Sequence, residues 1–310
     1  MLHEVILLIS GLLLLYLGAE GLVRGSAQVA NRFGIPPLII GLTIVAFGTS
    51  APELVVSVNA ALRGGGDIAL GNVIGSNIAN IAVILGLSAL IHPLKVTLQV
   101  LRRDVPWLIG ATLLFLLLFI DRKIGHIEAI VLFSGMVFYL FHSISTSRKE
   151  LCEENVFKVK KGGTFFHEIV FIVVGLSLLV FGSRLFVDGS IALARILGVS
   201  EAVIGLTIVA AGTSLPELAT SVVASLRKNA DIAVGNIVGS NIFNIFCILG
   251  VAGTVKPLYG NGIQTFDMLS LLVFTLLLLP FMWSKFILSR TEGAILLLLY
   301  SLYLFRLWPR

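Results

Sequence analysis

Glu53 and Glu217 lie in otherwise apolar stretches and have the chemistry of cation ligands. Glu53 follows Thr49 by four residues and Ser50 by three, within the motif GTSAPE. On a helix this spacing places the three side chains where their oxygens can point toward one position. A carboxylate within a membrane span is costly and usually indicates a functional site. The motif therefore predicts a buried site built from carboxylate and hydroxyl oxygens.

The same chemistry occurs twice, because the sequence contains an internal repeat. Residues 41–90 recur as residues 205–254 without a gap, at an offset of 164 residues. Roughly 30 of the 50 aligned positions are identical, which indicates a repeated structural unit. Thr213 and Ser214 thus stand in the same relation to Glu217 as Thr49 and Ser50 to Glu53. Two carboxylates delivered by repeated segments predict one shared site.

A second repeated motif, GNxxGSNxxN, supplies further polar side chains. The serine and the last asparagine are four residues apart and share a helix face. We interpret these as ligands: Ser76, Asn80, Ser240 and Asn244. For the motif's other asparagines, a ligand role and hydrogen bonding between packed helices remain equally open. These are Asn72, Asn77, Asn236 and Asn241.

A proline in each first motif predicts a kinked or broken helix beside the glutamate. Pro52 has no N–H, so it cannot form the helical hydrogen bond to the carbonyl of Gly48. A break would free carbonyl oxygens such as that of Ala46 to line a cavity, where irregular backbone is tolerated at membrane depth. Pro216 and Ala210 repeat the arrangement.

Carboxylate, hydroxyl, amide and carbonyl oxygens favour Ca²⁺, Mg²⁺, Mn²⁺ or Na⁺ over zinc or copper. One Ca²⁺ would neutralise two ionised glutamates, and several Na⁺ could occupy overlapping positions. Mutually exclusive occupancy of one site is the simplest basis for antiport. We expect these ions to be substrates, with no cofactor and no enzymatic activity, because no nucleophile–base pair or zinc motif accompanies the glutamates.

The elements that must position these residues are membrane helices. The chain has 310 residues, of which 57% are hydrophobic and 13% charged, with a mean hydropathy of +1.03. A soluble domain carries about 25% charged residues, and a spanning helix needs about 20 apolar residues. We therefore predict an all-α polytopic membrane protein with about ten spans. The predicted spans are 4–23, 38–62, 68–91, 104–120, 126–145, 167–187, 202–226, 232–255, 266–284 and 292–307.

The predicted organisation is two five-helix repeats, 1–146 and 167–310, joined by a polar linker at 147–166. Because five is odd, the second repeat enters the membrane from the opposite side, so the repeats are inverted, as in many secondary transporters. The distribution of lysine and arginine predicts a cytoplasmic linker and both termini outside. The short loops suggest a prokaryotic plasma (inner) membrane. The net charge of +5 forms no stripe typical of nucleic-acid binding, and no obligatory protein partner is evident.

The two motifs, each present twice, resemble those of the cation/calcium exchanger superfamily, most closely the prokaryotic sodium/calcium exchangers. The resemblance implies inverted repeats, ion sites between the second, third, seventh and eighth helices, and alternating access by sliding of the first and sixth. It implies that Glu53 and Glu217 bind Ca²⁺. The residues it implies for the remaining Ca²⁺ and Na⁺ positions are Ala46, Thr49, Ser50, Ser76, Asn80, Ala210, Thr213, Ser214, Ser240 and Asn244.

The residue at position 244 departs from the pattern of some family members and bears on which ions are transported. Some relatives, including potassium-dependent exchangers, have Asp at the position of Asn244, so the asparagine here argues against potassium dependence. The leading hypothesis is Na⁺/Ca²⁺ antiport. The alternative is an antiporter of H⁺ and Ca²⁺ or another divalent cation, in which a glutamate would carry protons. A cation channel and an intramembrane enzyme are weaker hypotheses.

Overall fold

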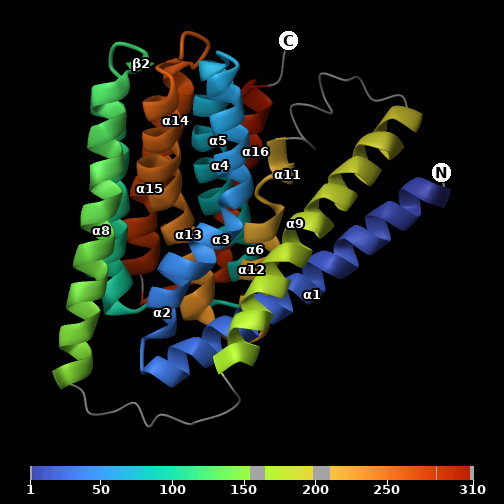
Figure 1. The fold of residues 1–310 in the computed structure, drawn as a ribbon, viewed down its shortest axis with the longest axis vertical. Helices are drawn as coiled ribbons and strands as arrows, with labels where there is room; N and C mark the ends of the chain where they lie inside the picture. Colours follow the sequence, from blue (N-terminus) through green and yellow to red (C-terminus); the bar gives the residue numbers. More distant parts are fainter. Residues whose placement is uncertain (1, 154–164, 198–209, 284, 308–310) are drawn as a thin grey trace.

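The computed structural model describes residues 2–153, 165–197, 210–283 and 285–307, which form helices joined by short turns (Figure 1). The first half contains α1 (Leu2–Phe33), α2 (Pro37–Ile40), α3 (Ala46–Thr49), α4 (Ala51–Leu62), α5 (Gly66–Ala79), α6 (Gly86–Ile91), α7 (Val105–Leu118) and α8 (His126–Glu153). The second half contains α9 (Phe165–Ile196), α11 (Ala210–Gly212), α12 (Leu215–Leu226), α13 (Ala230–Phe243), α14 (Leu249–Val255), α15 (Thr265–Trp283) and α16 (Arg290–Leu307). The π-helical turns are η1 (Gly41–Val45), η2 (Asn80–Leu85), η3 (Val100–Asp104) and η5 (Asn244–Ile248).

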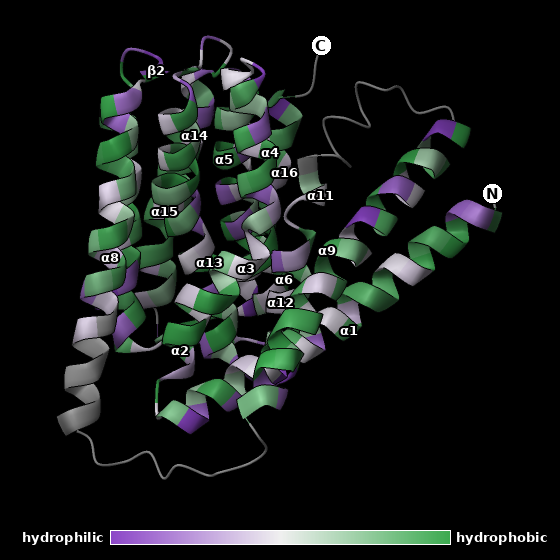
Figure 2. Ribbon diagram, in the orientation of Figure 1, coloured by the Kyte–Doolittle hydropathy of each residue, from purple (hydrophilic) through white to green (hydrophobic). Residues whose placement is uncertain are grey.

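The described helices match the predicted membrane spans. Six are long and apolar enough to cross a membrane, or seven if the bent pair Pro37–Thr49 and Ala51–Leu62 forms one span. The remaining predicted spans correspond to η3 with α7, to α16, and to α11 with α12. For the predicted span 202–226, residues 202–209 lie outside the described part of the chain. Helices α1, α8 and α9 consist largely of apolar residues (Figure 2), and many of their large apolar side chains are exposed, as a lipid environment requires.

Two short strand pairs show that the repeat extends over the whole of each half. Strand β1 (Leu94–Lys95) pairs with β4 (Ile287–Leu288), and β2 (Lys123–Ile124) pairs with β3 (Leu258–Tyr259). Moving every residue by the repeat offset exchanges the two pairs, with their registers preserved. The last two helices of each half are thus equivalent, although their sequences show little match.

The first helix of each half is longer than predicted. Helix α1 runs to Phe33 rather than residue 23, and α9 covers Phe165–Ile196 rather than 167–187. The physical reason is that the helices stay in contact along their length, and Arg32 near the end of α1 binds Glu168 near the start of α9 at 2.7 Å. Helix α1 ends where Gly34 adopts a positive φ of 65°, a common helix C-cap.

Helices α1 and α9 are antiparallel neighbours that pack through glycines (Figure 1). A methyl group on Gly18 would lie 2.8 Å from the carbonyl oxygen of Gly175, and one on Gly11 would lie 2.9 Å from that of Gly182. Small residues allow such close backbone approach in lipid, where packing drives helix association. The opposite directions of these equivalent helices confirm that the repeats are inverted.

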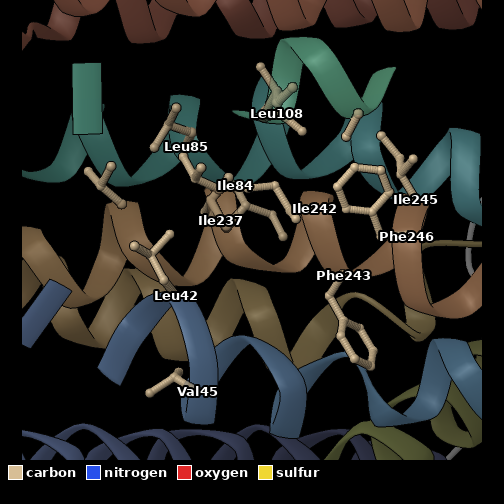
Figure 3. Packing of buried hydrophobic residues seen from close by; sticks show 14 of the residues in the cluster. Leu42, Val45, Ile84, Leu85, Leu108, Ile237, Ile242, Phe243, Ile245 and Phe246 are labelled. Carbon is tan, nitrogen blue, oxygen red and sulfur yellow. The ribbon is translucent and has the colours of Figure 1, made fainter. Parts of the chain in front are cut away.

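The centre of the molecule is the segment from α13 through η5 to α14, whose window of membrane-span length is 100% buried. Leu42 and Val45 of η1 lie on one side of it, and Ile84 and Leu85 of η2 lie on the other, around Ile237 and Ile242 (Figure 3). This packing holds the two copies of each motif against one another. We name the end where α8 ends and α9 begins the linker end, and the opposite end the terminal end.

Candidate ion-binding site

The second span breaks at the first motif, as the proline predicted. Helix α3 ends at Thr49, Ser50 leaves the helical region with ψ 5°, and α4 begins at Ala51 after a bend of 46°. The break places Glu53 in the first turn of α4, and Glu217 takes the same position in α12. A helix N-terminus stabilises negative charge through its unpaired N–H groups and dipole. Local structure thus favours a carboxylate at both positions.

Each glutamate is held by a hydroxyl from the other repeat. The Ser50 hydroxyl donates to Glu217 Oε1 at 2.8 Å, and the Ser214 hydroxyl donates to Glu53 Oε1 at 3.1 Å. Glu53 is 1% exposed and Glu217 is 0% exposed. The repeat offset exchanges these two bonds. The two motifs therefore form one site, with both carboxyl groups in it, as the repeat predicted.

Several oxygens of this site are buried without a hydrogen-bond partner. The second carboxyl oxygens, Oε2 of Glu53 and Oε2 of Glu217, accept no hydrogen bond. The amide oxygens Oδ1 of Asn80 and Oδ1 of Asn244 are also buried without a donor. Buried acceptors without partners are costly, and each requires an explanation. A bound cation would account for all four, because its positive charge would replace the missing donors.

Hydroxyl groups add neutral ligands next to the carboxylates. Thr213 lies beside the carboxyl group of Glu53, and Ser240 lies beside that of Glu217. Neither hydroxyl makes a hydrogen bond of ordinary length. Asn244 is one turn beyond Ser240 on the same face, so the polar face of the segment from α13 into η5 runs past Glu217. The donor set combines two carboxylates with hydroxyl and amide oxygens.

Two asparagines hold the backbone of the glutamates. Asn72 donates to the Glu53 carbonyl at 3.2 Å and to the Ser57 hydroxyl at 2.9 Å. Asn236 makes the equivalent bonds to the Glu217 carbonyl and to Ser221, at 3.4 and 2.9 Å. The sequence motifs did not single out the two serines. Their signal was present, because each lies four residues after a glutamate and recurs at the repeat offset.

The remaining asparagines of the second motif connect the two repeats. Asn77 donates to the Asn241 carbonyl at 3.2 Å, and Asn241 donates to the Asn77 carbonyl at 3.3 Å. Asn80 donates to Asn241 Oδ1 and Asn244 donates to Asn77 Oδ1, both at 2.9 Å. All four side chains are at most 1% exposed. The packing alternative left open by the sequence thus describes Asn77 and Asn241, which bind the neighbouring repeat.

The other predicted ligands differ in their contacts. Thr49 lies beside the carboxyl group of Glu217, and its hydroxyl also has acceptors at 3.1 Å in its own helix backbone and at Asn236 Oδ1. Ser76 is buried one turn before Asn80. The Ala46 carbonyl accepts from the Ser50 N–H at 3.0 Å, so the break does not leave it without a donor. Ala210 begins α11, and its surroundings lie outside the described residues.

The donor chemistry fits a hard cation. Across the described ranges, no three His, Cys, Asp or Glu side chains come together as a metal site would require. The charged ligands available at this site are therefore the two glutamates, with at most two negative charges, and neutral oxygens would complete the coordination. Oxygen-only ligands of this kind suit Ca²⁺ and Na⁺.

One cavity lies next to the site. Its volume is about 350 Å³, and it lies between α4 and α9, lined by Pro52 and Val56 of the former and by Ser183 and Asp188 of the latter. Thr213 also lines it. Since Val56 and Asp188 lie beyond the break toward the ends of α4 and α9, the cavity extends from the site toward the terminal end.

The description "Sodium/calcium exchanger protein" belongs to a family model that matches residues 3–145 and 167–308. The chain belongs to this family. The two matched segments correspond to the two halves described above, and they leave out residues 146–166 between them. This confirms the resemblance inferred from GTSxPE and GNxxGSN.

Relatives match over nearly the full length. The putative antiporter CaxA of Alkalimonas amylolytica is 37% identical, with 99% of each chain covered. The sodium/calcium exchanger MaX1 of Methanosarcina acetivorans is 33% identical, with 96% of this chain and 97% of the relative covered. A solved structure of the sodium-calcium exchanger NCX_Mj, soaked with zero Na⁺ and Ca²⁺, has a TM-score of 0.86 at 31% identity, covering 99% of each chain.

The family confirms the predicted exchanger fold, with about ten transmembrane helices in inverted repeats. The chain is an integral membrane protein, a transporter and not an enzyme. Its activity is cation/Ca²⁺ antiport. The ligand assignments of the twelve predicted residues and the division at 147–166 stay predictions.

Proposed function

We propose that this chain exchanges Na⁺ for Ca²⁺ across the membrane, at one site between its two repeats. The observation that carries the proposal is the pair of buried glutamates, each bonded through one oxygen to the opposite repeat and each with a second oxygen that has no donor. Two negative charges match one Ca²⁺. With the neutral oxygens nearby, they also match several Na⁺, so the two ions would exclude each other. The printed names of MaX1 and NCX_Mj support sodium as the coupling ion.

Alternating access follows from the same arrangement. Helices α1 and α9 contact each other through glycines, and α9 lines the cavity next to the site, so we propose that the two helices slide together against the remaining helices. Movement of this kind would close the cavity at the terminal end and open a path at the linker end. We further propose that the terminal end faces outward across a plasma membrane, as the lysine and arginine distribution predicts.

Proton-coupled exchange is the second candidate, and the burial of the two glutamates favours it. A carboxylate that loses its cation in a buried site can be neutralised by a proton instead. In that mechanism the proton binds at the same carboxyl oxygens as the cation, so the geometry of the site is compatible with both sodium coupling and proton coupling. The two candidates differ in the gradient that drives uptake.

Ca²⁺ uptake into proteoliposomes separates the candidates. Vesicles holding the purified protein are loaded with Na⁺ or with choline at equal pH inside and outside, and ⁴⁵Ca²⁺ uptake is measured. Uptake that requires internal Na⁺ and stops when a sodium ionophore removes the gradient supports the proposal. Uptake that ignores Na⁺ but follows an imposed pH gradient contradicts it and assigns proton coupling.

A further inference from the structure

Asn77 and Asn241 bind no carboxylate, yet they lie at the centre of the polar network between the repeats. Both are 0% exposed. An asparagine amide has an oxygen end and a nitrogen end of similar shape, and only the oxygen end attracts a cation. An asparagine ligand therefore needs a neighbour that fixes which end faces the ion.

The backbone fixes the orientation of the first amide. A carbonyl oxygen can only accept, so the Asn241 carbonyl requires the nitrogen end of Asn77, at 3.2 Å. The oxygen end of Asn77 then faces Asn244, whose nitrogen donates to it at 2.9 Å. This leaves Asn244 Oδ1 as the end without a hydrogen bond. The backbone carbonyl of Asn241 thus determines the orientation of the Asn244 amide through two successive hydrogen bonds, with Asn77 between them.

The other repeat contains the same chain of bonds in reverse. The Asn77 carbonyl fixes Asn241 at 3.3 Å, and Asn241 Oδ1 accepts from the nitrogen of Asn80 at 2.9 Å. Asn80 Oδ1 remains without a donor. Each repeat therefore orients the amide that the opposite repeat contributes to the site.

We propose that Asn77 and Asn241 are positioning residues for ion binding, which hold the amide oxygens of Asn244 and Asn80 toward the cation. They touch no ion themselves and act through the asparagine of the opposite repeat. This rests on the proposed function, because it assumes that Ca²⁺ binds among these oxygens. Partners that orient a ligand in this way commonly change metal affinity by about 10- to 100-fold when removed.

Double-mutant cycles test the proposal, with Ca²⁺ affinity measured by calorimetry on the purified full-length protein. Asn77→Ala is expected to weaken Ca²⁺ binding about tenfold in the otherwise unchanged protein. In an Asn244→Ala background it is expected to change affinity less than about twofold, since no amide is left to orient. In an Asn80→Ala background it should keep its tenfold effect, because Asn77 does not bind the Asn80 side chain.

The matched pair reverses the pattern: Asn241→Ala should lose its effect with Asn80→Ala and keep it with Asn244→Ala. An equal effect of Asn77→Ala in both backgrounds would show that it only supports packing, and would overturn the proposal. If an alanine variant does not fold, Asn77→Ser or Asn241→Ser takes its place, since serine places no acceptor at the distant amide. Absence of Ca²⁺ binding by the unmodified protein would contradict the proposed function instead.

Discussion

At the scale of single residues, the site depends on two buried glutamates whose carboxyl groups are each hydrogen-bonded through only one oxygen. One oxygen of each glutamate is bound by a serine of the opposite repeat, and the other accepts no hydrogen bond. A buried ionised carboxylate needs a compensating positive charge. A bound cation would therefore both stabilise the folded protein and be the ion that is transported. An apo protein with both groups ionised would be strained by their repulsion, and a divalent ion relieves it.

The substitution Glu53→Gln tests this requirement. The amide keeps the size of the side chain and can still accept from Ser214, so the fold should persist, whereas loss of one charge should lower Ca²⁺ exchange at least about 100-fold. Initial rates of Ca²⁺ uptake in proteoliposomes, with size-exclusion profiles for folding, measure both. Asp121→Asn in an exposed turn is the matched control and should transport normally. Transport by the Glu53→Gln variant at the normal rate would remove Glu53 from the site.

The sequence predicted these residues because the chemistry is local and repeated. Glutamate, threonine and serine within one turn can be seen without a fold, and the repeat offset doubles the signal. It did not predict which repeat supplies each hydroxyl. That the Ser50 hydroxyl binds Glu217 rather than Glu53 follows from how α4 and α12 face each other, which is a tertiary property. Ser57 and Ser221 were missed for a different reason, because a serine in a helix usually bonds its own backbone.

At the scale of elements, the helices that carry the two motifs differ in regularity from α1 and α9. The helices that carry the motifs are broken or contain π-helical turns: η2 begins at Asn80 and η5 begins at Asn244. Such turns are frequent at functional sites, because they redirect side chains within a helix. Helices α1 and α9 are instead continuous over 32 residues each and meet through glycines. The sequence analysis placed the ends of both helices too early, since contact with a partner helix extends them.

The glycine contact predicts a position where one methyl group is harmful. In Gly18→Ala the new methyl would lie 2.8 Å from the backbone of α9, so the helices must separate, at a cost of about 1–3 kcal/mol. We expect a lower thermal-unfolding midpoint and slower exchange. Gly110→Ala in α7 is the control, because no atom lies within 4 Å of that position, and it should leave both quantities unchanged or slightly raise stability. Equal behaviour of the two variants would contradict close packing of α1 on α9.

At the scale of the whole molecule, the two repeats are equivalent in fold but not in charge. Glu20 of α1 binds Arg227 at the end of α12, with a nitrogen–oxygen distance of 2.7 Å, and it also pairs with Arg24. The repeat offset places Arg184 and Arg63 at the positions equivalent to Glu20 and Arg227. Two arginines cannot form an ion pair, so the contact that α1 and α9 make with the rest of the protein differs at the two ends. The cavity between α4 and α9 lies toward the end where this pair is absent.

Under the alternating access proposed above, we expect the Glu20–Arg227 pair to favour the state that is closed at the linker end. The pair is partly exposed, with 47% of the Arg227 side chain accessible, so solvent screening keeps its contribution small. A small bias of this kind changes the ratio of two conformations by only a few-fold. Because the bias acts on populations, it should appear in the accessibility of the cavity at the terminal end before it appears in Ca²⁺ affinity.

Labelling of Val187→Cys, a cavity residue, by a membrane-impermeant maleimide measures that accessibility in a background without Cys152 and Cys247. Glu20→Gln should slow the labelling roughly two- to fivefold, because weakening the contact at the linker end raises the population in which the terminal end is closed. The charge-exchanged double variant Glu20→Arg with Arg227→Glu should restore the rate, while Asp121→Asn should leave it unchanged. High salt should reduce the difference between the Glu20→Gln protein and its parent, since it screens the exposed pair. A Glu20→Gln protein that labels at the parental rate would show that the pair contributes no bias. An open cavity at the terminal end would then have to result from the packing of α9 against α11 and α12.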